Sequence, residues 1–367
     1  MIAETLGQKI ARRIRAEGPL SLAAYMAMAL HDPVDGYYAQ HQPIGAGGDF
    51  VTAPEISQIF GELIGLWCAE TWRRLGQPDP VILAELGPGR GVLMSDLLRA
   101  AATVPEFRRA ARVHLVETSA VLRAEQQQRL GRFGPVWVSG AADLPDGPVL
   151  IVANEFLDAL PIRQFVRGAV HWSERLVALD DENRFVFVEG PESLAASLLV
   201  PPGQRGSAAP GTVAEVCPAA LSLASALGAR LAQQPGAALF SDYGYFPRAP
   251  GPTLGGFQRH QPVSILDAPG TADLSAHVDF AAFAEAGRAA GAEIHGPVAQ
   301  GRFLAELGVG LRLAALRARA TPSQRQALDS GVGRLLDPAE MGTLFKVIAL
   351  ISPGLPPPPG FGASCEG

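Results

Sequence analysis

The chain has 367 residues, of which 48% are hydrophobic and 18% charged, and its formal net charge is −6. A chain of this length forms one large α/β domain with additions, or two domains. The net acidic charge is unlike the basic surface of most nucleic-acid-binding proteins. No apolar stretch reaches the length of a membrane span. We therefore expect neither nucleic-acid binding nor membrane insertion.

The cysteines and the N-terminal residues indicate the cellular compartment of the protein. Cys68, Cys217 and Cys365 show neither metal-ligand spacing nor an even disulfide framework, which is typical of a reducing environment, and we expect no metal site. The N-terminus has an amphipathic pattern, with Ile10 and Ile14 on one side, instead of the apolar core of a signal peptide. The resulting prediction is a cytoplasmic protein.

Helical and strand patterns alternate along the chain. Residues 1–76 have the periodicity of helices, interrupted by a loop rich in Gly, Pro and Asp at 31–54. From residue 80, short apolar runs alternate with helices, which is typical of a parallel sheet. We predict strands at 81–86, 112–117, 135–138, 148–153 and 237–242. Further elements are an antiparallel meander at 163–189, helices at 218–233 and 280–290, and strands near 292–299 and 344–351.

These elements predict an α/β fold with three parts along the chain. A helical N-terminal region or lid spans 1–76, a core spans 77–352 with an insertion at about 163–235, and a Pro-rich tail at 353–367 is expected to be disordered. If the last two strands pair as an antiparallel edge, the Rossmann-like sheet has seven strands. The insertion and the N-terminal helices would then lie over the carboxyl ends of the strands, where such sheets bind ligands.

The most informative motif is Glu-Leu-Gly-Pro-Gly-Arg-Gly at 85–91, between the first strand and a helix. Its glycines permit positive φ and a close approach of the backbone to a ligand. A dinucleotide site requires a further glycine where this chain has Val92. Glu85 would repel a pyrophosphate but suits a ligand with an ammonium group, such as S-adenosyl-L-methionine. The motif alone favours that cofactor only moderately, and such turns also occur without a ligand.

Carboxylates also follow the second and fourth predicted strands. Glu117 would accept hydrogen bonds from ribose hydroxyls, or it would cap the next helix. Glu155 and Asp158 lie three residues apart after the fourth strand, so together they could hold a guanidinium through bidentate hydrogen bonds. A turn cap at Asp158 and a solvated Glu155 explain the pattern equally well.

Two other segments carry polar residues of interest. A polar, Gly-rich loop at 47–57 enters a helix, and we expect Thr52 or Ser57 to cap that helix. The alternative is that the loop forms a lid over a cofactor. Asp242 ends the fifth strand, and His277 lies among acidic residues at 273–280. Either residue could accept a proton, but a histidine in such a place is more often a structural hydrogen bonder.

Six segments together resemble the MidA family: 48–58, 85–91, 154–161, 241–244, 273–280 and 341–347. The resemblance extends from about residue 5 to 352, in order. It implies a class I S-adenosyl-L-methionine-dependent methyltransferase fold. Mitochondrial members are complex I assembly factors, for which it implies symmetric dimethylation of an arginine on an NADH dehydrogenase subunit. One departure is Gly255, where the family usually has a basic residue.

The resemblance assigns residues to two halves of one site. Glu85, Gly87 and Gly89 would line the cofactor, and Glu117 would bind its ribose. We place Asn154 at the cofactor as well, because it follows the fourth strand directly. The acceptor half would comprise the carboxylates Glu155 and Asp158. We add Asp242 or His277 as the proton acceptor on the basis of strand-end placement and not of the resemblance.

The resulting prediction is a bacterial methyltransferase that acts on arginine in a protein, with a respiratory NADH dehydrogenase subunit as one candidate acceptor. Three alternatives are a non-catalytic assembly factor that binds S-adenosyl-L-methionine, a small-molecule methyltransferase and, least favoured, a dinucleotide oxidoreductase. The sequence leaves the acceptor, the methylation state and the oligomeric state open.

Overall fold

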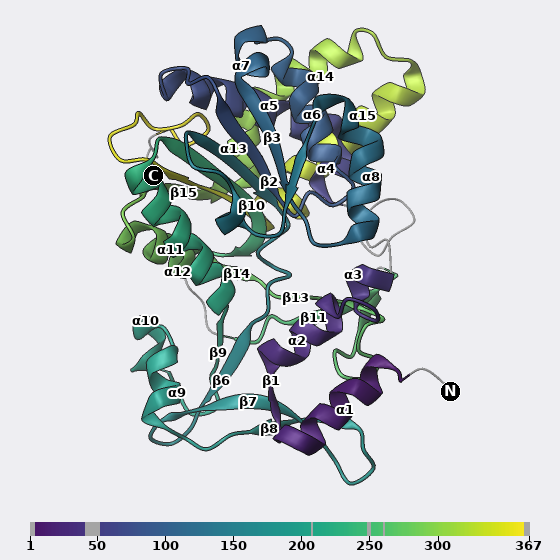
Figure 1. The fold of residues 1–367 in the computed structure, drawn as a ribbon, viewed down its shortest axis with the longest axis vertical. Coiled ribbons are helices and arrows are strands. Elements are labelled where there is room, and N and C mark those ends of the chain that lie inside the picture. The colour runs from purple at the N-terminus through teal and green to yellow at the C-terminus, as the bar shows by residue number, and fades with distance from the viewer. Residues whose placement is uncertain (1–3, 41–51, 207, 248–250, 260, 363–367) are drawn as a thin grey trace. The chain divides into compact units, whose positions relative to one another are not determined.

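The computed structural model describes residues 4–40, 52–206, 208–247, 251–259 and 261–362. The chain divides into two compact units, both drawn in Figure 1. The first unit comprises 1–50, 157–222 and 246–282, and the second comprises 51–156, 223–245 and 283–367. This division differs from the predicted domain boundaries, because the helix that follows Ser57 belongs to the second unit and not to the helices before it.

The second unit contains the predicted Rossmann-like sheet, with the strand order β15-β16-β10-β5-β2-β3-β4 (Figure 1). Strands β2, β3, β4, β5 and β10 pair in parallel, and β16 is antiparallel to β10 and β15. The order reverses between β2 and β5, and doubly wound sheets bind ligands at the carboxyl ends of the strands at such a point. The bounds are β2 Val81–Leu86, β3 Ala111–Val116, β4 Val136–Val138, β5 Val149–Asn154, β10 Gly236–Tyr245, β15 Glu293–Ala299 and β16 Phe345–Ile351.

Helices cover both faces of this sheet, which is why its central strands are nearly continuous apolar runs. Two glycines bring α5 close to α6: a Cβ on Gly65 would lie 2.6 Å from the carbonyl oxygen of Leu97, and one on Gly61 would lie 2.7 Å from Cβ of Asp96. The helices, including two that begin in the first unit (α11 and α12), are α4 Ala53–Ile56, α5 Gln58–Arg74, α6 Val92–Ala101, α7 Pro105–Ala110, α8 Ala120–Leu130, α11 Pro218–Gln233, α12 Phe280–Ala289, α13 Gln300–Glu306, α14 Val309–Arg317, α15 Pro322–Leu336 and α16 Met341–Leu344.

The start of α5 bears on the predicted helix caps. The hydroxyl of Ser57 accepts a hydrogen bond from the amide of Ile59 at 3.3 Å, which confirms Ser57 as a cap. Thr52 occupies the equivalent place before α4, but its side chain makes no capping bond. The Gly-rich residues 47–51, which the alternative interpretation made a lid, lie outside the described residues.

The first unit has two smaller sheets, β1-β7-β6-β9 with β8 added beside β7, and β12-β11-β13. The meander predicted at 163–189 corresponds to the antiparallel strands β6, β7 and β8. The elements of this unit are α1 Leu6–Glu17, β1 Leu20–Ser21, α2 Leu22–His31, α3 Tyr37–Gln40, β6 Arg163–Arg167, β7 Trp172–Leu179, β8 Phe185–Glu189, α9 Leu194–Leu199, α10 Pro202–Arg205, β9 Val213–Val216, β11 Gly255–Gln258, β12 Gln261–Val263, β13 Asp273–Ser275 and β14 Val278–Asp279.

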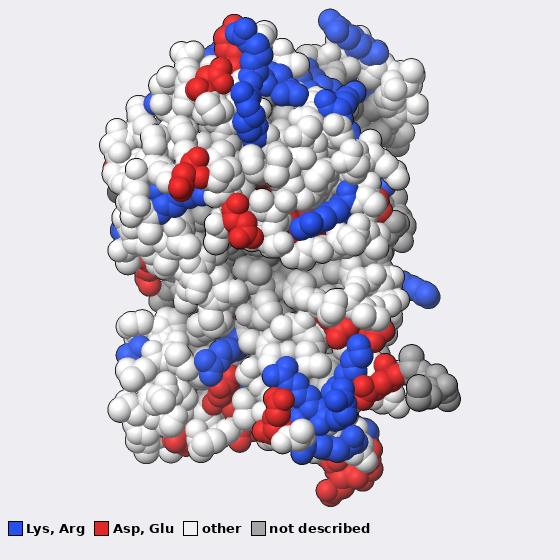
Figure 2. Space-filling view, in the orientation of Figure 1, with Lys and Arg blue, Asp and Glu red and all other residues white. Residues whose placement is uncertain are grey.

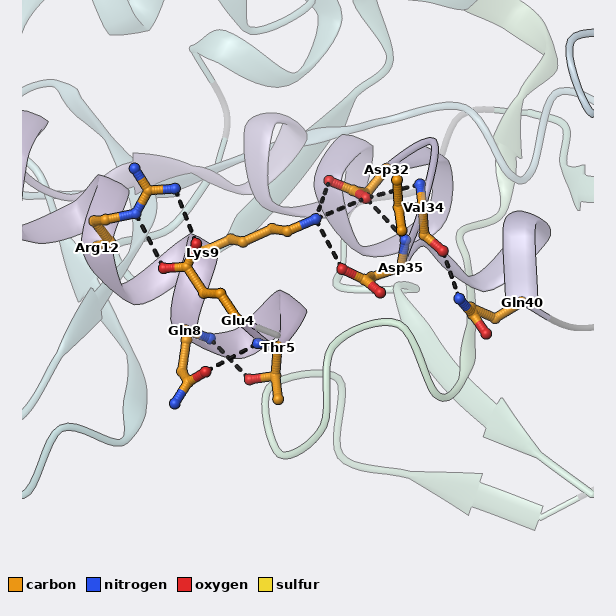
Figure 3. Close-up of polar contacts among 9 residues, drawn as sticks. All are labelled: Glu4, Thr5, Gln8, Lys9, Arg12, Asp32, Val34, Asp35 and Gln40. Atoms are coloured by element: carbon orange, nitrogen blue, oxygen red, sulfur yellow. Dashed lines mark hydrogen bonds and ion pairs between the residues drawn. The ribbon is translucent and has the colours of Figure 1, made fainter. Parts of the chain in front are cut away.

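A lysine joins the first helix to the turn after the second (Figure 3). The ammonium of Lys9 lies 3.3 Å from Oδ1 of Asp32 and 2.8 Å from Oδ2 of Asp35. The start of α1 is closed by a capping box, in which Thr5 and Gln8 exchange side chain-to-backbone hydrogen bonds. The two ion pairs of Lys9 fix the turn at 32–35, which leads into α3.

Charged side chains of both signs lie beside one another on the face drawn in Figure 2, including the region of α1. There Arg12 pairs with Glu4, and Arg13 pairs with Glu17. Such exposed pairs contribute little to stability. Among the described helices, none combines the length and apolar character needed to cross a membrane.

The prediction of a disordered tail is wrong for the part of the tail that the structure describes, which ends at residue 362. The indole of Trp67 donates a hydrogen bond to the carbonyl oxygen of Pro359 at 3.1 Å. The ring of Phe361 is buried, with its centroid 5.3 Å from that of Phe303. The buried ring and this hydrogen bond thus hold the segment against the rest of the second unit.

We expect Phe361→Ala to lower the free energy of unfolding by about 3 kcal/mol, because it removes a buried aromatic ring. Denaturant unfolding measures the change. Leu344→Ala is the matched control, since this side chain is exposed and its loss should cost less than about 1 kcal/mol. Equal stability of the Phe361→Ala variant and the parent protein would show that the tail is not docked in solution.

Candidate active site

The turn after β2 is built from glycines in the left-handed region. Gly87, Gly89 and Gly91 have φ values of 62°, 51° and 75°. A Cβ on Gly87 would lie 2.7 Å from Cδ2 of Phe156, so a side chain is excluded by contact as well as by conformation. The amide of Gly87 also donates to the carbonyl oxygen of Val116 at 3.1 Å. The turn is therefore fixed between the ends of β2, β3 and β5.

Glu85 lies on β2 just before this turn and is buried. Its carboxylate accepts a hydrogen bond from the amide of Met94 in the first turn of α6, whereas Oε2 has no hydrogen-bond partner among the described residues. Burial raises the pKa of Glu85 to about 8, and the nearby Glu117 adds to the increase. A buried acceptor oxygen without a donor is uncommon and indicates a ligand or a water molecule at this place.

The raised pKa of Glu85 predicts a pH-dependent stability. The folded protein holds this proton up to about pH 8, whereas the unfolded chain releases it near the ordinary value of 4.5. The contribution of Glu85 to stability is therefore complete below pH 4.5, falls as the pH rises and is lost above pH 8. Between pH 4.5 and pH 9 the parent protein should therefore lose about 5 kcal/mol of stability relative to Glu85→Gln, which has no titrating group at this position.

Thermal unfolding of both proteins across this pH range, without cofactor, measures the effect. Glu106→Gln, at an exposed position on α7, is the control and should show no such trend. A constant difference between Glu85→Gln and the parent protein would contradict the raised pKa.

Glu117, directly after β3, is buried and positioned by several donors. Its Oε1 accepts from the amides of Thr118 and Ser119 at 2.8 and 2.7 Å, and its Oε2 accepts from Nε2 of Gln126 at 3.3 Å. Burial raises the pKa of Glu117, and these hydrogen bonds oppose the increase. The carboxylate thus anchors the turn into α8, whose N-cap is Ser119, and its binding of the ribose stays a prediction.

Asn154 and Glu155 continue from the carboxyl end of β5. Glu155 has a positive φ of 49°, which is uncommon and strained for a residue other than glycine and recurs at active sites. Its Oε1 accepts from Nδ2 of Asn154 and from the amide of Ala53, both at 3.0 Å. The Oδ1 atom of Asn154 is buried, with no hydrogen-bond partner among the described residues. Glu155 therefore holds the start of α4 at the end of β5.

Asp242, on the neighbouring strand β10, supports the same turn. Its Oδ2 accepts from the amide of Phe156 at 3.0 Å, and its Oδ1 accepts from that of Tyr243 at 2.9 Å. The amide of Glu155 in turn donates to the carbonyl oxygen of Ser241 at 2.9 Å. These contacts indicate that Asp242 positions the backbone at Phe156 and Tyr243. The use of Asp242 as a proton acceptor stays a prediction.

Asp158 and His277 belong to the first unit. The carbonyl oxygen of Asp158 accepts from the amide of Ala276 at 3.0 Å, and the amide of His277 donates to the hydroxyl of Thr253 at 2.9 Å. The backbone there is thus well anchored. The other predicted site residues lie together in the second unit: Glu85, Gly87, Gly89, Glu117, Asn154, Glu155 and Asp242. The pairing of Glu155 with Asp158 stays a prediction, as does a catalytic use of His277.

Sequence reasoning missed several residues that organise these parts. Gln126 contacts both Glu117 and the glycine turn, and Arg90 of that turn pairs with Glu55 and Glu125 at 3.6 and 3.2 Å. Gln126 could have been found as a polar residue four positions after Leu122 in the apolar stripe of a helix. The ion pairs of Arg90 had no comparable signal in the sequence.

The second unit has the groups that S-adenosyl-L-methionine requires. Glu85 and Asn154 provide buried acceptor oxygens without donors among the described residues, which suits a ligand with an ammonium group and hydroxyls. The turn at 87–91 brings the backbone of three glycines with positive φ to the carboxyl end of β2. These acceptor oxygens and the glycine turn therefore fit S-adenosyl-L-methionine.

The strand order, the glycine turn and the carboxylates at the strand ends define a class I S-adenosyl-L-methionine-dependent methyltransferase fold. A family model described as "Putative S-adenosyl-L-methionine-dependent methyltransferase" matches residues 63–298. The chain belongs to this family, which confirms the predicted MidA-like membership and fold class and the cofactor S-adenosyl-L-methionine.

Similar proteins cover nearly the whole chain. The mitochondrial protein arginine methyltransferase NDUFAF7 of Danio rerio is 37% identical over 96% of this chain and 88% of its own length. The human protein of that name is 34% identical over 92% and 81%. A candidate methyl transferase from Burkholderia thailandensis, crystallised with S-adenosyl-homocysteine, has a TM-score of 0.83 and 33% identity, covering 98% of this chain and 94% of its own.

Proposed function

We propose that this methyltransferase transfers the methyl group of S-adenosyl-L-methionine to an arginine side chain of a protein. The observation that carries the proposal is Glu155, a carboxylate held in a strained conformation at the carboxyl end of β5. The similar mitochondrial proteins are named protein arginine methyltransferases, which supports arginine as the acceptor. A respiratory NADH dehydrogenase subunit is the acceptor that the MidA resemblance suggests.

The cofactor half of the proposed site comprises the strand ends of β2, β3 and β5. We assign Glu117 to the ribose hydroxyls, and Glu85 and Asn154 to the polar groups of the methionine part. Gly87 and Gly89 let the backbone approach the ligand. Bound S-adenosyl-L-methionine supplies a methyl group activated by the adjacent sulfonium.

The acceptor half depends on Glu155. A guanidinium donates charge-assisted hydrogen bonds to a carboxylate, so Glu155 would orient it and draw the positive charge toward the bonded nitrogens. The remaining nitrogen would then be the better nucleophile. Because Ala53 and Asn154 already hold Oε1, the carboxylate is positioned before the substrate binds, and positioning is the main source of catalysis that we assign to the chain.

Incubation with labelled S-adenosyl-L-methionine and a cell extract tests the proposal. We expect the label in a small number of proteins, identified by mass spectrometry. Label only in small molecules would favour a metabolite methyltransferase, and cofactor binding without any labelled product would favour a non-catalytic assembly factor. Calorimetry with S-adenosyl-homocysteine and NAD tests the cofactor, and tighter binding of NAD would contradict the assignment.

A further inference from the structure

We propose that Gln126 is a positioning residue that sets the ribose specificity of the cofactor site, because it holds Glu117 and the carbonyl of Gly89 in a fixed relation. The inference rests on the proposed assignment of Glu117 and the glycine turn to the cofactor. Gln126 would not contact the cofactor itself and would act through Glu117 and the turn at Gly89, which we assign to the cofactor.

Gln126 lies on α8 and is completely buried. Its Nε2 donates to the carbonyl oxygen of Gly89 at 2.7 Å and to Oε2 of Glu117 at 3.3 Å, and its Oε1 accepts from the indole of Trp137 at 2.8 Å. One side chain thus connects the turn after β2, the end of β3 and strand β4.

The indole determines which way the amide of Gln126 faces. The Nε1–H group of Trp137 can only donate, so it requires the amide oxygen of Gln126. The two hydrogens on Nε2 are then directed at Gly89 and Glu117, which offer acceptor oxygens. The orientation of the amide, which is often ambiguous in proteins, is therefore fixed here by chemistry.

This arrangement completes the positioning of Glu117. The amides of Thr118 and Ser119 bind Oε1, and Gln126 supplies the hydrogen bond to Oε2. Loss of the Gln126 amide would leave Oε2 free to turn away from the ribose hydroxyls. Hydrogen bonds to charged groups contribute about 1.5–3 kcal/mol, which is enough to change the discrimination between a ribose and a deoxyribose.

Gln126 is not the only contact between α8 and the glycine turn. Arg129 donates to the carbonyl oxygen of Arg90 at 3.0 Å, and Arg90 pairs with Glu125. A Cβ on Gly91 would meet Leu130 at 3.0 Å. Because these contacts remain when the amide is removed, we expect the turn to stay in place in a Gln126 variant while Glu117 loses its orientation.

The test compares S-adenosyl-homocysteine with its analogue that lacks both ribose hydroxyls, by calorimetry on the full chain. Gln126→Met keeps the length of the side chain and removes its hydrogen bonds. We expect it to weaken S-adenosyl-homocysteine binding about 30-fold and binding of the analogue about threefold, so that roughly a tenfold preference for the ribose is lost. Gln128→Met, on the exposed side of α8, should change neither affinity.

Glu117→Gln separates failure of this inference from failure of the site assignment. If Glu117→Gln leaves both affinities unchanged, Glu117 does not bind the ribose and the assignment itself is wrong. If Glu117→Gln reduces the ribose preference and Gln126→Met weakens both ligands equally, Gln126 is merely structural and the inference is overturned. Gln126→Leu supplies a second variant, which likewise offers no hydrogen bond to Glu117 and should lose the ribose preference as well.

Discussion

Replacement of Gly87 by alanine should weaken binding of S-adenosyl-homocysteine at least about 100-fold. Alanine in the left-handed region costs about 1–2 kcal/mol, and its Cβ would lie 2.7 Å from the ring of Phe156. Since this ring follows Glu155 directly, its displacement should disturb the acceptor half of the site as well. Calorimetry measures the affinity, and thermal unfolding measures the accompanying loss of stability.

Gly134→Ala is the matched control for this prediction. Gly134 has a similar φ of 65°, but nothing lies within 4 Å of the position of its Cβ. This variant should therefore carry the conformational cost alone and retain its affinity. Normal binding by Gly87→Ala would show that the turn does not approach the cofactor closely.

The second large effect is expected for Glu155→Gln, which should lower the rate of methyl transfer about 100-fold. The amide oxygen of glutamine can still accept from Ala53, so α4 should stay in place while the negative charge is removed. Affinity for S-adenosyl-homocysteine should change less than about threefold. Transfer of labelled methyl groups to a protein that the labelling experiment identifies as substrate measures the rate.

Asp158→Asn is the companion variant. A similar loss of rate would support a clamp formed by two carboxylates, and an unchanged rate would assign the guanidinium to Glu155 alone. Full methyl transfer by Glu155→Gln with normal cofactor binding would refute the proposed function of Glu155.

Much of the sheet could be predicted because its strands are short apolar runs. The observed strands Val81–Leu86, Ala111–Val116 and Val149–Asn154 differ by at most one residue at each end from those predicted. The glycine turn was also readable, because its chemistry lies within seven consecutive residues. Apolar strands and glycine turns can be predicted because each depends on a few consecutive residues.

Contacts between distant residues were harder to predict. Glu155 stood out as a carboxylate after a strand, but its hydrogen bond from the amide of Ala53, 102 positions away, had no signal in the sequence. The two compact units each combine three separate stretches of chain, so no change of composition marks their boundaries. Gln126 has three partners on three elements, and its function follows only from their meeting in space.

The chemical identity of the methylated residue tests the central claim most directly. Proteins labelled by this enzyme from methyl-labelled S-adenosyl-L-methionine would be hydrolysed to amino acids and separated by chromatography with mass detection. The proposed function predicts label in methylated arginine, which forms about 100-fold more slowly when Glu155→Gln replaces the parent protein. Label in methylated lysine, glutamine or a free metabolite, with none in arginine, would contradict it.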